Sequence, residues 1–118
     1  MHHSNNFLIF SHEQDVDGIF SAAVLRMVYP SSEVILTNYG FQNMLAVKNE
    51  ILSSMDSHSL GTIIISDIGV NYESYMPVYE ALCSSKQRGF TNIWVDHHVW
   101  PEGMEEKFSA IYEIALCS

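Results

Sequence analysis

The sequence predicts an α/β domain with a doubly wound, mainly parallel five-stranded sheet and helices on both faces. Short apolar segments rich in Ile, Val and Phe alternate with amphipathic segments of about ten or more residues. This alternation is typical of βαβ units, whose right-handed crossovers cover both faces of a parallel sheet. Hydrophobic residues make up 47% of the 118 residues and charged residues 16%, so we expect one compact domain over residues 1–118.

Five segments have the composition of strands, because each is a short apolar run with bulky or β-branched residues that polar residues end. In chain order they are residues 7–10, 33–37, 62–66, 92–95 and 110–115. The first is uniformly bulky, which indicates a strand buried on both faces. The third is the most β-branched stretch in the chain.

Between these strands, apolar residues recur at the spacing of one helix face. In chain order the predicted helices occupy residues 18–30, 40–52 and 72–88. Pro30 ends the first, and Gly89 follows the third as its C-cap. Residues 53–61 are polar and rich in Ser, so we expect a connecting loop there, and residues 101–108 are polar enough for a surface helix or loop.

Charge and composition exclude several classes of function. Five Lys and Arg against fourteen Asp and Glu give a net charge of -9, which disfavours sequence-independent binding of nucleic acid phosphates. The apolar runs are shorter than the roughly 20 residues that a membrane helix needs. The N-terminal residues lack a secretion signal, and Cys83 and Cys117 form no disulfide framework, so we expect a cytoplasmic protein without a membrane partner.

Ionisable residues follow three of the predicted strands. His12, Asp15 and Asp17 follow the first, Asp67 follows the third, and the triplet 96–98 (Asp-His-His) follows the fourth. Because ligands bind at the carboxyl ends of parallel strands, we expect these side chains at one edge of the sheet. Carboxylates packed that closely repel one another, so cations should lie among them. Since the chain has only five basic residues, we expect metal ions.

The types of side chain indicate which metal. Imidazole and carboxylate ligands without thiolate suit Mn²⁺, Co²⁺ or Zn²⁺, whereas oxygen ligands alone would favour Mg²⁺. More side chains are available than one catalytic ion uses, and a carboxylate can bridge two ions about 3.5–4 Å apart. We therefore expect two divalent ions, with Mn²⁺ as the first choice and Co²⁺, Mg²⁺ or Zn²⁺ as alternatives.

Together these residues resemble the DHH phosphoesterase superfamily, which includes RecJ-like exonucleases, oligoribonucleases and cyclic dinucleotide phosphodiesterases. The residues that carry the resemblance are His12, Asp15 and Asp17 in a first motif, Asp67 in a second, and Asp96, His97 and His98 in a third. The resemblance covers essentially the whole chain, as an N-terminal catalytic domain of this superfamily. No single motif is specific, and their conjunction after three strands carries the assignment.

The resemblance implies a role for each of these residues. The implied metal ligands are His12, Asp15 and Asp67 for one ion and Asp17, Asp67 and His97 for the other. Asp67 would thus bridge the two ions. His98 would bind the substrate phosphate as a catalytic residue, and Asp96 would act beside the metal or as an additional ligand.

The chain departs from the superfamily pattern in two ways. No Asp follows Asp96, although a fourth motif normally supplies one to the second ion, and Glu113 is the one residue placed to substitute. The smaller second domain of the superfamily, which binds substrate, is absent from the chain. We therefore expect this chain to fold and bind metal but to turn substrate over poorly by itself.

Two functions follow from these observations. The first is a metal-dependent phosphoesterase that hydrolyses phosphodiester or phosphoanhydride bonds of a nucleotide or oligonucleotide by two-metal activation of water. The alternative is a degenerate or truncated metal-binding or interaction module without catalysis of its own. As partners we expect a phosphate-containing small molecule or a short nucleic acid, and a homodimer and completion by a C-terminal domain stay open.

Overall fold

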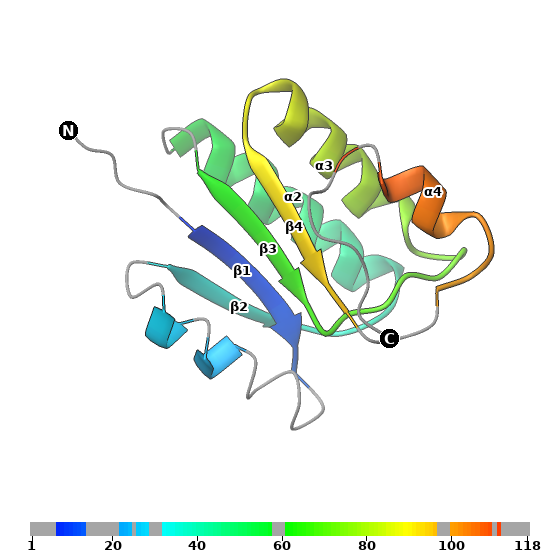
Figure 1. The fold of residues 1–118 in the computed structure, drawn as a ribbon, viewed down its shortest axis with the longest axis horizontal. Helices are drawn as coiled ribbons and strands as arrows, with labels where there is room; N and C mark the ends of the chain where they lie inside the picture. Colours follow the sequence, from blue (N-terminus) through cyan, green and yellow to red (C-terminus); the bar gives the residue numbers. More distant parts are fainter. Residues whose placement is uncertain are drawn as a thin grey trace.

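The computed structural model describes residues 7–13, 22–24, 26–28, 32–57, 61–96, 100–109 and 111. Within these residues one parallel sheet is formed by β1 (Phe7–His12), β2 (Glu33–Thr37), β3 (Thr62–Ser66) and β4 (Thr91–Val95). The strand order is β2-β1-β3-β4, and all four arrows in Figure 1 point the same way. The α/β class and the parallel sheet are confirmed.

Strand β1 lies in the middle of the sheet and is longer than predicted. It continues to His12, because its ladder with β2 extends to the pair His12 and Thr37. Side chains on both of its faces are buried, with Ile9 and Phe10 fully so, as the bulky sequence predicts. The central strand is therefore buried on both faces, and it is hydrogen-bonded to β2 up to its last residue.

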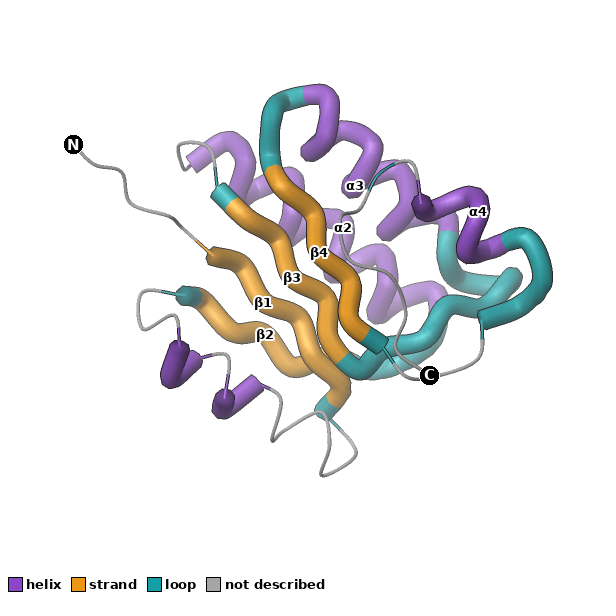
Figure 2. Tube along the Cα trace, in the orientation of Figure 1, coloured by secondary structure: helices purple, strands orange, loops and turns teal. Residues whose placement is uncertain are grey.

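Helices α2 (Phe41–Ser57) and α3 (Met76–Gln87) pack side by side on one face of the sheet (Figure 2). The expected loop at residues 53–61 is wrong over its first five residues, where α2 continues to Ser57. The physical reason is Met55, whose side chain is buried in the core and draws the Ser-rich turn into the helix. Tertiary packing overrides the weak local preference of the serines for loops.

Helix α3 begins at Met76, four residues after its predicted start at Tyr72. The Asn71 side chain explains the difference, because its Oδ1 accepts hydrogen bonds from the backbone N–H and the hydroxyl of Ser74 and holds residues 71–74 in a turn. Proline in the first turn then suits the start of the helix. Gly89 follows the helix with a φ of 90°, the left-handed conformation expected of a glycine that ends a helix.

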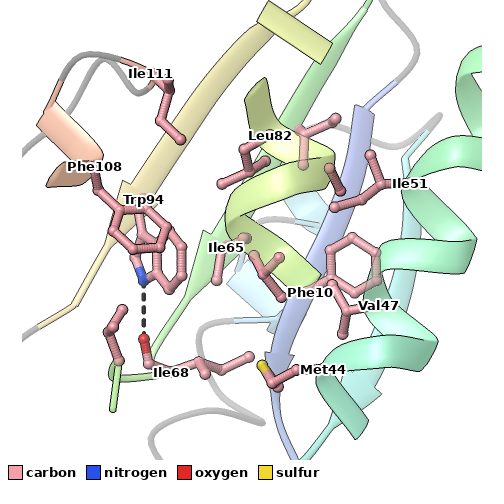
Figure 3. Packing of buried hydrophobic residues seen from close by; sticks show 14 of the residues in the cluster. Phe10, Met44, Val47, Ile51, Ile65, Ile68, Leu82, Trp94, Phe108 and Ile111 are labelled. Carbon is pink, nitrogen blue, oxygen red and sulfur yellow. Dashed lines mark hydrogen bonds between the residues drawn. The ribbon is translucent and has the colours of Figure 1, made fainter. Parts of the chain in front are cut away.

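The segment expected as a surface helix or loop contains α4 (Met104–Ser109), and α4 is not confined to the surface. Its Phe108 is fully buried and meets the rings of Trp94 and Trp100 edge to face at centroid distances of 5.1 and 5.6 Å. Figure 3 shows Phe108 beside Trp94 in the core. Two buried apolar residues four positions apart, Met104 and Phe108, attach an otherwise polar helix to the domain.

The core between the sheet and these helices contains side chains from every layer (Figure 3). Its largest members include Phe10, Ile51, Ile65, Leu82, Trp94 and Phe108. One polar side chain, Asn92 of β4, is buried beside this core. Its amide donates hydrogen bonds to the carbonyl oxygens of Leu82 at 3.1 Å and Ile111 at 2.7 Å. This amide attaches the end of the described chain to the last strand.

Other sequence predictions concern segments that are described only in part. Residues 22–24 and 26–28 are helical, as predicted, and Val24, Met27 and Val28 are exposed, Met27 by 80%. Of the predicted fifth strand, residues 110–115, the structure describes Ile111 alone, in a turn. No helix among the described residues is long and apolar enough to cross a membrane.

Candidate functional site

The four strands end at one edge of the sheet, which we call the carboxyl edge. His12 is the last residue of β1, and one polar residue follows each other strand: Asn38 after β2, Asp67 after β3 and Asp96 after β4. Ser11 is paired with Ser66, and Ser66 with Val95, so the next residues along are neighbours on adjacent strands. Adjacent strands lie about 5 Å apart, which brings His12, Asp67 and Asp96 into one row.

The His12 ring is held from two sides. Its Nε2 lies 3.0 Å from Oδ1 of Asn38, and its face meets the ring of Tyr39 edge-on at a centroid distance of 4.9 Å. The side chain is 8% exposed. An imidazole that is buried to this degree and held at one nitrogen keeps a defined orientation at the carboxyl edge.

Asp67 has an unusual backbone conformation for a residue with a side chain. Its φ is 60°, and among the described residues it is the one non-glycine residue at positive φ. Asp and Asn tolerate this left-handed region better than other residues, but at some cost in free energy. The residue is 4% exposed, and its Oδ2 atom is buried. Strained conformations of this kind cluster at functional sites, so the observation favours a role for the Asp67 carboxylate.

The loop that carries Asp67 is fixed by three hydrogen bonds to other elements. The Asp67 backbone N–H donates to the Val95 carbonyl oxygen at 2.9 Å. The Trp94 indole donates to the Ile68 carbonyl at 2.9 Å, a bond drawn in Figure 3. The Gly69 backbone N–H donates to the Tyr39 hydroxyl at 3.1 Å. Residues 67–69 are therefore positioned by β4 on one side and by Tyr39, in the loop after β2, on the other, which pre-organises the Asp67 carboxylate.

Asp96 is almost fully buried, with 2% exposure, and its Oδ2 accepts a hydrogen bond from the Trp100 indole at 2.8 Å. Trp100 packs in turn against Trp94 at a centroid distance of 5.0 Å. A buried carboxylate needs hydrogen bonds to offset its lost hydration. The indole supplies one of them and orients the Asp96 carboxylate relative to β4.

Three of the predicted site residues, His12, Asp67 and Asp96, thus lie at the ends of adjacent strands at the carboxyl edge. The other predicted site residues lie outside the described residues; they are Asp15, Asp17, His97, His98 and Glu113. In the part of the chain that the structure describes, no three His, Cys, Asp or Glu side chains form a group that could hold a metal ion. Because three of the five predicted ligands lie outside that part, the metal centre stays a prediction.

Sequence reasoning missed Asn38, Tyr39 and Trp100. Each contacts a predicted site residue or its loop, and none belongs to a motif that the sequence singles out. One signal was available for the first two, because Asn38 and Tyr39 directly follow a strand and precede Gly40, which turns the chain at a φ of 105°. Trp100 lies four residues beyond Asp96, and its burial depends on α4.

Three of the five basic side chains contact groups other than the predicted site residues. Lys48 pairs with Glu80 at 2.9 Å, and the Lys107 ammonium lies 5.1 Å from the centroid of the Tyr79 ring. Arg88 pairs with Asp56 at 3.2 Å, beyond the end of α3 and at the opposite edge of the sheet. In a chain of net charge -9, three of the five Lys and Arg side chains are thus engaged by groups other than the predicted site residues.

Comparison with known proteins does not assign the chain to a family. No family model, curated protein or solved structure matches it. The fold and the carboxyl edge therefore define a class of protein by themselves: an α/β domain with a parallel sheet whose strands end in a histidine and buried carboxylates. Its function must be argued from the chemistry of those side chains.

Proposed function

We propose that the chain is a metal-dependent phosphoesterase domain of the DHH type. It would hydrolyse phosphodiester or phosphoanhydride bonds of a nucleotide or oligonucleotide. The observation that carries this proposal is the row formed by His12, Asp67 and Asp96 at the ends of three adjacent strands. Each of these residues comes from a different motif of the resemblance, so their meeting at one edge is what the proposal requires.

The topology of the sheet supports a binding site at this position. The chain passes from β1 to β2 on one side and then crosses to β3 on the other, so the strand order changes direction between β1 and β3. In open parallel sheets ligands bind outside the carboxyl ends of the strands at such a switch point. His12 and Asp67 lie on its two sides.

The available ligand atoms fit a divalent ion of the Mn²⁺, Co²⁺ or Zn²⁺ type. His12 offers an imidazole nitrogen and Asp67 a carboxylate, a combination that suits these ions, with Mg²⁺ as an alternative. The remaining ligands in the proposal are Asp15, Asp17 and His97. Two bound divalent ions would also cancel four of the nine net negative charges. We propose Mn²⁺ as the first choice.

The roles of the residues follow from their chemistry. Two bound ions would activate water and stabilise charge on the phosphoryl oxygens. Asp67, pre-organised by its loop, would hold both ions, and His98 would bind the substrate phosphate. Asp96, oriented by the Trp100 indole, would act beside the metal or as an additional ligand.

The finer arrangement of the fold is part of the proposal. The connection after β1 leads to one side of that strand, whereas the connections from β2 to β3 and from β3 to β4 lead across the sheet in the opposite direction. If all three connections are right-handed, the one from β1 to β2 passes over the face of the sheet opposite α2 and α3. A surface hollow supports this path of the chain, because Ala22, Ala23 and Arg26 line it together with Val34 and Leu36 of β2. We accordingly propose a doubly wound sheet, a fifth strand in the part of the predicted range 110–115 that follows Ile111, and a cytoplasmic protein whose Cys83 is a free thiol.

A second function remains in competition, namely a metal-binding or interaction module without catalysis of its own. It is favoured by one feature of the sequence: none of the residues from His97 to Ser118 is an Asp that could act as the fourth-motif ligand of the second ion. Glu113 would then be its replacement or an ordinary surface residue. In either case phosphate-containing molecules are the proposed ligands, and a homodimer or a C-terminal domain would complete the substrate site.

Titration with Mn²⁺ tests the proposal. Calorimetry and metal analysis of the wild-type chain should give two ions, with the ion of His12, Asp15 and Asp67 bound more tightly. Asp67→Asn should lose both ions, whereas Asp56→Asn, the same change at an exposed residue on the opposite edge, should bind as the wild type does. Affinity should weaken below about pH 6.5, because histidine binds metal as the neutral imidazole.

A substrate panel then separates the two functions. The Mn²⁺-loaded chain is incubated with short oligonucleotides, single-stranded ends and cyclic dinucleotides, and products are followed by chromatography. Slow turnover that Asp67→Asn abolishes supports the phosphoesterase. Tight binding of two ions without any hydrolysis moves the assignment to the binding module, and absence of Mn²⁺ binding refutes both.

A further inference from the structure

We propose that Asn38 is a positioning residue that keeps the proton of the neutral His12 ring on Nε2, so that Nδ1 is the ring nitrogen whose lone pair could bind a cation. This inference rests on the proposed metal function, although its central test does not need a metal. Asn38 is no member of the motifs above and lies one residue beyond the pairing of His12 with Thr37. Its side chain contacts the His12 ring from the end of β2.

The hydrogen bonds of Asn38 determine which way its amide faces. Its Oδ1 lies 2.8 Å from the backbone nitrogen of Tyr39 and 3.0 Å from Nε2 of His12. A backbone N–H can only donate, so the amide atom that faces Tyr39 must be the oxygen. The same oxygen faces His12, and Nε2 must therefore be the donor in that second bond.

A neutral imidazole carries one proton, so a proton on Nε2 leaves the lone pair on Nδ1. Histidines that bind metals almost always donate their other ring N–H to an oxygen acceptor, which fixes both the tautomer and the plane of the ring. The pair of Asn38 and His12 has this form. The edge-on contact of the Tyr39 ring with His12 restrains the plane of the imidazole from a second direction.

The same short loop also reaches the other side of the switch point. The Tyr39 hydroxyl accepts a hydrogen bond from the backbone of Gly69, two residues beyond Asp67. Asn38 thus contacts His12 after β1, and Tyr39 contacts the loop of Asp67 after β3, although neither is itself a predicted metal ligand. The loop of Asn38 and Tyr39 can therefore orient the two predicted ligands, His12 and Asp67, without supplying a ligand of its own.

Three variants test the positioning role. Asn38→Leu removes the acceptor at nearly the same side-chain size, and Asn38→Asp keeps an oxygen acceptor for both hydrogen bonds. The matched control is Asn43→Leu, since the Asn43 amide donates to the Tyr39 carbonyl at 2.8 Å in the same loop. Long-range ¹H–¹⁵N correlation spectra of the metal-free protein at about pH 8, above the ordinary His pKa, show which ring nitrogen of His12 carries the proton.

The wild-type protein, Asn38→Asp and Asn43→Leu should show His12 protonated at Nε2, and Asn38→Leu a mixture of tautomers. Mn²⁺ affinity by calorimetry should fall roughly 10- to 100-fold in Asn38→Leu alone. An unchanged tautomer in Asn38→Leu overturns the positioning role, whether or not the wild type binds Mn²⁺. A wild-type proton on Nδ1 overturns it even if Asn38→Leu fails to fold. A shifted tautomer in a protein without Mn²⁺ affinity supports the positioning of His12 and refutes the proposed function instead.

Discussion

Replacing Asp67 by Gly and by Ala separates the backbone role of this residue from the role of its carboxylate. Its φ of 60° lies in the left-handed region, where a Cβ atom costs roughly 1–2 kcal/mol and glycine has no such cost. Both substitutions remove the carboxylate, so the difference in their free energies of unfolding isolates the backbone. Alanine regains roughly 0.4–1 kcal/mol by restricting the unfolded chain. We therefore expect Asp67→Gly to be the more stable variant by about 1 kcal/mol.

Urea unfolding measures this difference, with the fluorescence of the two buried tryptophans, Trp94 and Trp100, as the signal. The matched control is the same pair of substitutions at Asn49, an exposed position inside α2. In a helix alanine is favoured over glycine by about 1 kcal/mol, so the order of stability should be reversed there. An Asp67→Ala variant more stable than Asp67→Gly by about 1 kcal/mol, as expected at Asn49, would refute the left-handed conformation at this position.

Three further predictions concern the surroundings of the site. Trp100→Phe removes the indole donor to Asp96 and should lower the free energy of unfolding by about 1–3 kcal/mol; equal thermal stability of variant and wild type would contradict this. Asn92→Ala removes the donor to the Ile111 carbonyl and should cost a similar amount, about 1–3 kcal/mol, with faster amide exchange near the end of α4 as the second measurement. Partial burial raises the pKa of the Tyr79 phenol, so the unfolded chain ionises first and stability should fall above about pH 10; Tyr79→Phe should lose less, and an equal loss would exclude this cause.

The strands of this domain could be predicted from sequence because their signals are local. A run such as Thr62–Ser66 is apolar, β-branched and ended by a polar residue, and each of these properties is independent of the rest of the fold. Their carboxyl ends could be predicted for the same reason. Since parallel strands end at a common edge, the placement of His12, Asp67 and Asp96 at that edge followed from topology alone.

Features that depend on tertiary packing could not be predicted in this way. The end of α2 depends on the burial of Met55, and the burial of Phe108 depends on two tryptophans from other segments. The role of Asn38 is of the same kind. It requires β2 to lie beside β1 in the observed register, and a polar residue after a strand does not by itself indicate which neighbour it contacts.

The central position of β1 has a consequence for the order in which this domain folds. The pairing of β3 with β4 joins Thr62 to Thr91, whereas the pairing of β1 with β3 joins Phe7 to Thr62 and closes a chain segment nearly twice as long. Longer closures are entropically less favourable and slow the formation of contacts. The pairing of β1 with β2 joins Leu8 to Glu33 and closes a segment about as short as that of β3 with β4. We therefore expect the pairs β1–β2 and β3–β4 to form first and β1 to pair with β3 last. Pulse-labelled hydrogen exchange should protect the amides bonded within β1–β2 and β3–β4 before those that bond β1 to β3; the reverse order would exclude this sequence of events. The ends of β1 and β3, with His12 and Asp67, then come together only in the last pairing step. A cation bound at the carboxyl edge would therefore contact both residues only in the native state, so it would slow unfolding and leave the folding rate nearly unchanged.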